Sequence, residues 1–296
     1  MATLPLIDPP RSSTWVKTEV AQTSSPVVLD SPHSGTVYPA DFAFTCPKAD
    51  LRQAEDTHVE RLFSDAPSLG APLVHALFPR SYIDPNRHIG EIDTALLTET
   101  WPGEIRPSDK ARIGMGLVWR VLDEGTPIYA TPLTAQAVQA RIAACYAPYH
   151  TAVQAALDAA HAEHGKALLV NCHSMPTRSA RLTAEYGVDE CADFVLGDRD
   201  GSTCSPAITE AASAYLRAQG YQVAVNFPYK GVELVRKHGQ PTAGRHALQV
   251  EINRKLYMNE ITRELNTDVA DVQAVLRGLV ETLIAASYTL NEFKGE

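Results

Sequence analysis

The sequence predicts an α/β fold in which helices cover both faces of a mostly parallel or mixed central sheet. Short apolar runs typical of buried strands occur near residues 26–29, 72–77, 167–171, 222–225 and 246–252. Amphipathic or alanine-rich segments of helical length separate most of these runs. Strands that alternate with such helices favour parallel pairing, because the helix carries the chain back across the sheet.

A first helix is predicted over residues 51–66, after the strand at 26–29. Apolar side chains recur there at helical spacing and form one stripe, made of Leu51, Val59, Leu62, Phe63 and Ala66. A stripe of this width is typical of a helix that packs one side against the core. The apolar run at 72–77 should then be the next strand.

Three further helices are marked by their end signals. Thr134 is a suitable N-cap for a long alanine-rich helix that Pro148 should break or kink and Gly165 should end. The sequence from 205 to 220 begins with Ser-Pro and closes with Gly, which indicates a helix with its cap and terminator. A final amphipathic helix is expected over 268–286.

The remaining stretches should be irregular. Residues 1–24, rich in Pro, Ser and Thr, look like a loosely attached lead-in, and residues 89–115 predict a long excursion over the surface. Loops of that length are usually either functional lids or disordered. A length of 296 residues allows one large domain or two small ones, and the α/β pattern favours a single domain over 1–296.

Composition argues against several classes of partner. A net charge of −9 argues against a nucleic acid, because phosphate backbones are bound through clusters of Lys and Arg. No apolar run approaches the roughly 20 residues that cross a bilayer. The N-terminus lacks the basic and apolar segments of a signal peptide, so we expect a cytoplasmic protein that does not bind a membrane. The oligomeric state stays open.

The five cysteines are odd in number and scattered, without a CxxC pair. They indicate neither a disulfide framework nor a thiolate zinc site. Cys172 adjoins His173, but neighbouring residues of a strand face opposite sides, so Cys172 should pack in the core. A cysteine hydrolase acting through Cys172 is the least favoured alternative.

Two histidines occupy matching positions just beyond predicted strands. His33 follows the run at 26–29 within Ser-Pro-His-Ser-Gly, and His173 follows the run at 167–171 within Cys-His-Ser-Met-Pro. Ligands of open α/β sheets bind outside the carboxyl ends of the strands. Two imidazoles brought to that edge suggest a metal site, whereas a hydrogen-bonded structural role for each histidine is the alternative.

A metal site of this kind needs a third protein ligand. Asp56 lies three and seven residues before Val59 and Phe63, hence on the buried stripe of its predicted helix, where a carboxylate would be desolvated. It could instead serve as a cap or in a salt bridge near the helix start. Glu55 and His58 are neighbours that could take its place.

The strand at 246–254 alternates between apolar and polar residues, and Glu251 lies on its polar side. A hydrolytic metal site requires a carboxylate that takes a proton from water and passes it to the leaving group. Glu251, near a strand end, is suitable for this role. A solvated polar face is the alternative explanation.

A substrate clamp is predicted at the turn that carries Asn86 and Arg87. The guanidinium of arginine presents a rigid pair of donors that matches a carboxylate. Arg181 and Arg236 are further candidates. A surface turn with a solvated arginine is the alternative.

Taken in order, these motifs resemble the N-formylglutamate amidohydrolase (N-formylglutamate deformylase) family over residues 27–258. The matching segments are Pro32-His33-Ser34-Gly35, Asp56-Thr57-His58-Val59, Asp84-Pro85-Asn86-Arg87, Cys172-His173-Ser174, Asp193-Phe194-Val195-Leu196-Gly197, Asp200-Gly201, Tyr229-Lys230-Gly231 and His246-Ala247-Leu248-Gln249-Val250-Glu251. That family is similar in fold to zinc carboxypeptidases and aspartoacylases. The resemblance therefore implies a three-layer α/β sandwich with a mixed, mostly parallel central sheet.

The resemblance also implies an activity and roles for particular residues. Zn²⁺ would be bound by His33, Asp56 and His173, although this ligand set admits another divalent metal. Glu251 would be the general base, and Asn86 and Arg87 would hold the carboxylate of the substrate, with Arg87 also near the oxyanion. The expected reaction is hydrolysis of a small acyl amino acid, N-formyl-L-glutamate to formate and glutamate, as in histidine degradation.

Two departures from related sequences leave alternatives open. Carboxypeptidases carry a carboxylate three residues after the first histidine, where this chain has Thr36. Members of histidine degradation read Arg-His-Tyr-Gly where this chain reads Arg-Lys-His-Gly at 236–239. The alternatives are a carboxypeptidase or amidase acting on other acyl amino acids or peptides, and a metal-free binding protein on a hydrolase scaffold.

Overall fold

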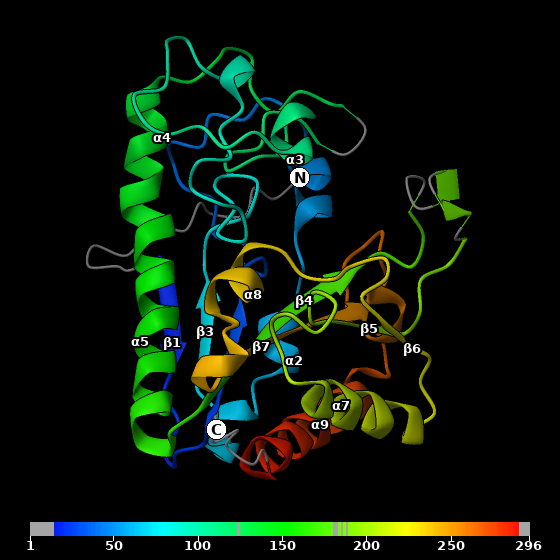
Figure 1. Ribbon diagram of the computed structural model, residues 1–296. Helices are drawn as coiled ribbons and strands as arrows, with labels where there is room; N and C mark the ends of the chain where they lie inside the picture. The colour runs from blue at the N-terminus through cyan, green and yellow to red at the C-terminus, as the bar shows by residue number, and fades with distance from the viewer. Residues whose placement is uncertain (1–14, 123–124, 180–182, 185, 188, 290–296) are drawn as a thin grey trace.

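The computed structural model describes residues 15–289 except 123–124, 180–182, 185 and 188. Over these residues, one sheet of seven strands has the order β1-β3-β2-β4-β7-β5-β6 (Figure 1). The strands are β1 (Val16–Glu19), β2 (Val27–Ser31), β3 (Leu73–Ala76), β4 (Ala167–Met175), β5 (Phe194–Gly197), β6 (Val223–Val225) and β7 (Arg245–Asn253). The central strands β3, β2, β4 and β7 run parallel, while β1 and β5 pair antiparallel with β3 and β7. The mixed, mostly parallel sheet predicted from the sequence is confirmed.

Helices cover both faces of this sheet. On one face lie α5 (Ala147–His164) and α8 (Glu233–His238), and on the other lie α2 (Val59–Leu62), α7 (Pro206–Ala218) and α9 (Val269–Thr289). The first core contains Val153 with Val28, and the second contains Leu276 with Leu29. Neighbouring strand residues thus enter different cores, as the pleat requires, and the three-layer sandwich is confirmed. None of the described helices combines the length and hydrophobicity needed to cross a membrane.

The long helix has the predicted start and end, and it continues through Pro148 without a break (Figure 1). The Thr134 hydroxyl accepts a hydrogen bond from the backbone N–H of Ala137 and caps α4 (Ala135–Arg141). A π-helical segment, Ile142–Tyr146, then joins α4 to α5. It ends two residues before Pro148, which has no backbone N–H for the helical pattern. Gly165 ends α5 with a φ of 70°.

The single helix predicted over 51–66 is wrong. The chain forms α1 (Lys48–Leu51), a 3₁₀ turn at Arg52–Ala54, the short α2, and a second 3₁₀ turn at Ala66–Leu69. His58, with a φ of 73°, interrupts the helical path. The apolar stripe is divided between two cores, because Leu51 packs in the α5 core and Val59 and Leu62 in the α9 core. One continuous helix could not reach both.

Two irregular stretches are better integrated than the sequence predicts. The lead-in contributes β1, which pairs with β3 and buries Val16, so residues 16–19 are not loosely attached; residues 1–14 lie outside the described part. The excursion at 89–115 contains only a 3₁₀ turn at Thr94–Leu96 and α3 (Asp109–Arg112). Ile92, Leu96 and Met115 nevertheless pack into the α5 core, so it is more than a surface loop.

Candidate active site

The sheet face that packs against α5 and α8 changes from apolar to polar along three neighbouring strands. The change occurs between Val28 and Asp30 in β2, between Leu169, Asn171 and His173 in β4, and between Ala247, Gln249 and Glu251 in β7. All the polar members of this set are buried. A solvated polar face is therefore wrong for Glu251, which is only 8% exposed. The polar ends of the three strands instead form an enclosed site.

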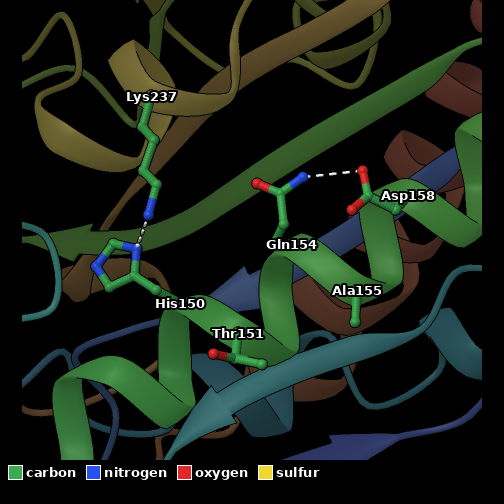
Figure 2. A pocket seen from close by; sticks show the side chains of 6 residues that line it. All are labelled: His150, Thr151, Gln154, Ala155, Asp158 and Lys237. Atoms are coloured by element: carbon green, nitrogen blue, oxygen red, sulfur yellow. Dashed lines mark hydrogen bonds between the residues drawn. The ribbon is translucent and has the colours of Figure 1, made fainter. Parts of the chain in front are cut away.

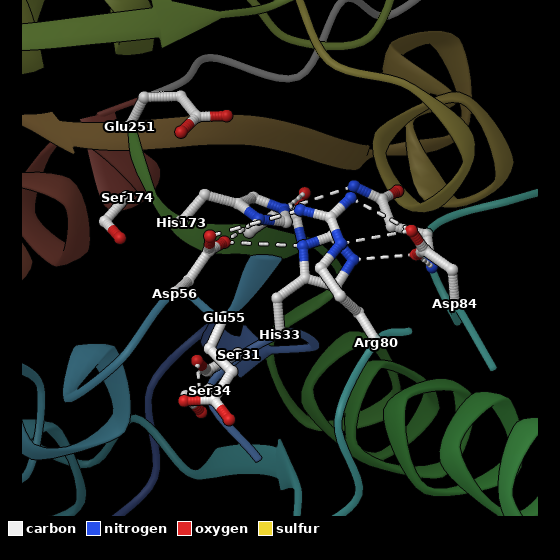
Figure 3. A network of polar contacts seen from close by, with 12 residues as sticks. Ser31, His33, Ser34, Glu55, Asp56, Arg80, Asp84, His173, Ser174 and Glu251 are labelled. Atoms are coloured by element: carbon white, nitrogen blue, oxygen red, sulfur yellow. Dashed lines mark hydrogen bonds and ion pairs between the residues drawn. The ribbon is translucent and has the colours of Figure 1, made fainter. Parts of the chain in front are cut away.

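His33, Asp56 and His173 meet at this polar region (Figure 3). His33 follows β2, and its carbonyl accepts a hydrogen bond from the backbone N–H of Asp56, which fixes the two loops together. Oδ2 of Asp56 lies 3.3 Å from Nδ1 of His33 and 2.9 Å from Nδ1 of His173. One ligand atom from each residue lies within 4.8 Å of the others, so the three side chains could hold one metal ion. His173 lies inside β4, not beyond a strand ending at 171 as predicted.

The outer nitrogen of each imidazole has its own polar partner. Nε2 of His33 lies 2.7 Å from Oδ1 of Asp84, and Nε2 of His173 lies 2.8 Å from Oδ1 of Asn171. The carboxylate of Asp84 favours a proton on Nε2 of His33, which leaves the Nδ1 lone pair of His33 directed at the shared centre. At Nε2 of His173, Asn171 offers an acceptor, and the amide nitrogen of Asn86 lies 3.1 Å away. Nδ1 of His33 is buried and has no hydrogen-bond partner among the described residues. A lone pair left unpaired in this way fits a cation.

A second layer of polar contacts supports His173. Asn171 donates its amide N–H to Oδ1 of Asp30, and the Tyr149 hydroxyl donates to Oδ2 of the same carboxylate. Burial raises the pKa of Asp30 to about 6, although these two hydrogen bonds work in the opposite direction. These hydrogen bonds fix the side chain of Asn171, whose Oδ1 in turn contacts Nε2 of His173.

Charges around Asp84 favour its ionised form. Burial alone would raise its pKa, but the guanidinium groups of Arg80 and Arg87 and the imidazole of His33 hold the pKa of this carboxyl well below its usual value. Arg80 donates to Oδ2 of Asp84 through both Nε and Nη2, and its Nη1 lies 4.0 Å from Oδ1 of Asp56. Arg80 is an arginine of the site that the sequence reasoning missed, because Pro-Arg-Ser carries no distinctive motif.

Glu251 lies beside the predicted ligands. It is paired in register with His173 across the parallel strands β4 and β7, and Figure 3 shows it on the side of His173 opposite Arg80 and Asp84. Gln249 donates its side-chain amide to Oε1 of Glu251 at 3.1 Å. Burial raises the pKa of Glu251 to about 7. A carboxyl that exchanges a proton near neutral pH is suited to general acid–base chemistry.

The predicted substrate clamp is buried next to the site. The amide of Asn86 accepts from the backbone N–H of Leu234 and contacts Nε2 of His173 at 3.1 Å. Arg87 is 6% exposed and donates to the carbonyls of Asn86 and Met115. The solvated surface turn is therefore wrong for this segment.

The remaining predicted residues lie elsewhere. Arg236 is on α8, where it forms an ion pair with Glu233, and Arg181 lies outside the described residues. Glu55, one alternative to Asp56, accepts from Tyr38 and Arg52, while Nε2 of His58 contacts the carbonyl of Arg263. Of Asp56, Glu55 and His58, only Asp56 lies next to the two histidines.

Cys172 is fully buried in the α9 core, on the opposite face of β4 from His173, as predicted. Burial raises the pKa of its thiol well above the usual value, so the thiolate is disfavoured. This environment argues against a nucleophilic role for Cys172.

A separate hollow of about 420 Å³ lies between α5 and α8 (Figure 2). On its wall, Nζ of Lys237 donates to Nδ1 of His150, and Nε2 of His150 donates to the carbonyl of Pro85. Pro85 belongs to the turn that carries Asp84 and Asn86. The contact with His150 therefore helps to fix the turn whose side chains contact His33 and His173.

Comparisons with known sequences and structures relate this chain to one protein family. The model of the N-formylglutamate amidohydrolase family matches residues 25–258. The chain is 30% identical over 266 residues to a protein of Pseudomonas aeruginosa named N-formylglutamate deformylase, covering 88% of this chain and 93% of that one.

Solved structures agree with that match. The crystal structure of N-formylglutamate amidohydrolase from Ralstonia eutropha JMP134 is 44% identical, with a TM-score of 0.89 over 93% of this chain and 98% of the other. A gene product of Agrobacterium tumefaciens shares the fold at 22% identity, with a TM-score of 0.65 over 92% and 95% of the two chains. The chain therefore belongs to the N-formylglutamate amidohydrolase family.

Proposed function

We propose that the protein is a metal-dependent hydrolase that cleaves the amide bond of an N-formyl amino acid. N-formyl-L-glutamate is the proposed substrate, with formate and glutamate as products. Membership of the family and the names of its relatives in Pseudomonas and Ralstonia support this substrate. The observation that carries the proposal is the convergence of His33, Asp56 and His173 next to a buried Glu251.

Zn²⁺ is the proposed metal. Two imidazole nitrogens and one carboxylate oxygen are a donor set of hydrolytic zinc enzymes, in which a fourth position is left for water. When bound, the ion would act as a Lewis acid toward the carbonyl and lower the pKa of that water. The unpaired Nδ1 of His33 and the occupied Nε2 atoms of both histidines support ligation through Nδ1.

Glu251 is the proposed general base and acid. Its carboxylate would accept a proton from the attacking water and then deliver it to the nitrogen of the departing amine. A pKa of about 7 suits both steps, because the group is readily protonated and deprotonated near neutral pH. The hydrogen bond from Gln249 to Oε1 restricts the carboxylate and so fixes the direction of proton transfer.

Arginine side chains are the proposed partners of two negative charges, the carboxylate of the substrate and the oxyanion that forms during hydrolysis. Arg80 is the proposed partner of the oxyanion, because its guanidinium lies between Asp84 and Asp56 at the edge of the ligand group. Arg87, with Asn86, remains the proposed clamp for the substrate carboxylate and a second oxyanion contact. Arg181 and Arg236 remain proposed contacts for the far end of the substrate.

Metal analysis and a substrate panel test the proposal. We expect one zinc ion per chain in the purified protein, release of formate from N-formyl-L-glutamate, loss of activity after chelation and recovery when Zn²⁺ is added back. The panel should include other N-acyl amino acids and short peptides. A protein without bound metal that remains active would refute metal dependence, and a preference for peptides would refute the proposed substrate.

A further inference from the structure

The two oxygens of the Asp56 carboxylate have different surroundings. Oδ2 lies 2.9 Å from Nδ1 of His173 and 3.3 Å from Nδ1 of His33. Oδ1 accepts a hydrogen bond of 3.1 Å from Nη2 of Arg254 and lies 4.0 Å from Nη1 of Arg80. One oxygen is thus engaged by a guanidinium while the other faces the two imidazoles.

Arg254 is held in a fixed position. It follows β7 directly, three residues after Glu251, and is 8% exposed. Its Nη2 also donates to the carbonyl of Glu55 at 2.9 Å, and its Nε donates to the hydroxyl of Ser174 at 3.2 Å. These contacts fix the guanidinium of Arg254 to the loop of Asp56 and to the strand of His173. The guanidinium would therefore not move with the Asp56 carboxylate if that carboxylate rotated. A buried, multiply bonded arginine differs in this respect from a surface ion pair.

We propose that Arg254 is a positioning residue that restricts Asp56 to binding the metal through one oxygen. This inference rests on the proposed metal site. A carboxylate that bound through both oxygens would occupy an additional coordination position. By engaging Oδ1 in a charge-assisted hydrogen bond, Arg254 would keep that position available for water or the carbonyl of the substrate. It would also keep Asp56 aligned before the metal arrives.

Two substitutions separate the geometry of Arg254 from its charge. Arg254→Met removes the donors and keeps much of the apolar stem, whereas Arg254→Lys keeps the charge without the planar fork. Lys255→Met is the matched control, because Lys255 is the next residue and pairs at the surface with Glu190 and Asp193. Zinc affinity would be measured by competition with a chromogenic chelator. The visible spectrum of the Co²⁺-substituted protein would report the coordination number.

We expect Arg254→Met to weaken zinc binding by roughly 10- to 100-fold, as for other partners of metal ligands. The cobalt bands should lose intensity, because a carboxylate that binds through both oxygens raises the coordination number. Arg254→Lys should give an intermediate affinity, and Lys255→Met should match the wild type. Circular dichroism would identify any variant that does not fold.

If Arg254→Met fails to fold, Arg254→Lys and Ser174→Ala provide the test, since Ser174→Ala removes only the hydroxyl that accepts from Nε. A wild-type zinc affinity and cobalt spectrum in the folded arginine variants would overturn the role of Arg254 and leave the metal site intact. A wild-type protein that binds no zinc would overturn the metal site itself, and the assignment of Arg254 with it.

Discussion

Two buried groups of histidines contact the turn at 84–87 and differ in the charges that face them. At the active site, Nδ1 of His33 and of His173 face the carboxylate of Asp56. In the hollow between α5 and α8, Nδ1 of His150 instead accepts a hydrogen bond from the ammonium of Lys237. Burial is similar in the two places. The sign of the neighbouring charge, more than burial, therefore distinguishes the two histidines grouped with Asp56 from His150.

The positive charge of Lys237 also affects the pKa values of His150 and His238, the histidines near the hollow. Burial, together with the charge of Lys237, lowers the pKa of His150 to about 3 and that of His238 to about 4. Both rings are therefore neutral at physiological pH. The ring of His150 connects α5 to Lys237 of α8 and to the carbonyl of Pro85 in the turn beside the active site.

The largest effect expected from this contrast is on metal content. His33→Ala and His173→Ala should each abolish zinc binding and hydrolysis, because each removes one of three ligands. His150→Ala should retain zinc, since its ring faces Lys237 and Pro85. Inductively coupled plasma mass spectrometry on the purified variants would measure this. A fully zinc-loaded double variant of His33 and His173 would contradict the site.

A smaller effect, on rate alone, is expected at Glu251. Glu251→Gln should lower kcat by roughly 10²- to 10⁴-fold, because it removes the proton acceptor. Its zinc content should not change. In the wild type, kcat/KM should fall as pH decreases, with a midpoint at or below the pKa of about 7, because the bound cation would favour the ionised form. A pH profile that stays flat from 5 to 8 in the wild type would argue against this base.

The smallest effect, on stability, is expected at His150. Its folded-state pKa is lowered from 6.5 to about 3, so the unfolded chain binds the proton first. The stability that this neutral ring contributes is complete above pH 6.5 and decreases as pH falls toward the folded-state value. Between pH 6.5 and 4 the loss should be about 3 kcal/mol.

His150→Gln tests this pH dependence, because it keeps an N–H donor for Pro85 and cannot titrate. Urea unfolding of the metal-free protein at several pH values would measure the free energy of unfolding, without interference from acid release of zinc. The variant should show a shallower decrease with falling pH. An identical slope in both proteins would assign the acid sensitivity to other groups.

The sequence was a good guide to the sheet, because strand periodicity and helix-end signals are local. The strands that carry the site start within one residue of the predicted positions, although β4 extends past 171, and the helices capped by Thr134 and starting at Pro206 lie where local patterns predict them. The strand β5 was missed, although its segment was noted as a family motif. The segment around Asp56 was misassigned, because its apolar residues serve two cores and only tertiary contacts show that division.

The candidate ligands could be found from the sequence, but their partners could not. His33 and His173 were identified by matching contexts after strands, and Asp56 by a stripe that turned out not to be one helix. Arg80 and Arg254 carry no local signal of function. Each becomes recognisable only when the fold brings it to an oxygen of Asp84 or Asp56.

Each strand of the site has one half that contributes to the α5 core and one half that carries reactive groups. Val28, Leu169 and Ala247 are in the first half, and Asp30, His173 and Glu251 are in the second. The apolar half and the whole opposite face pack in the two cores, so the cohesion of the sheet does not depend on the polar half. A substitution in the polar half should therefore change the chemistry of the site more than the fold.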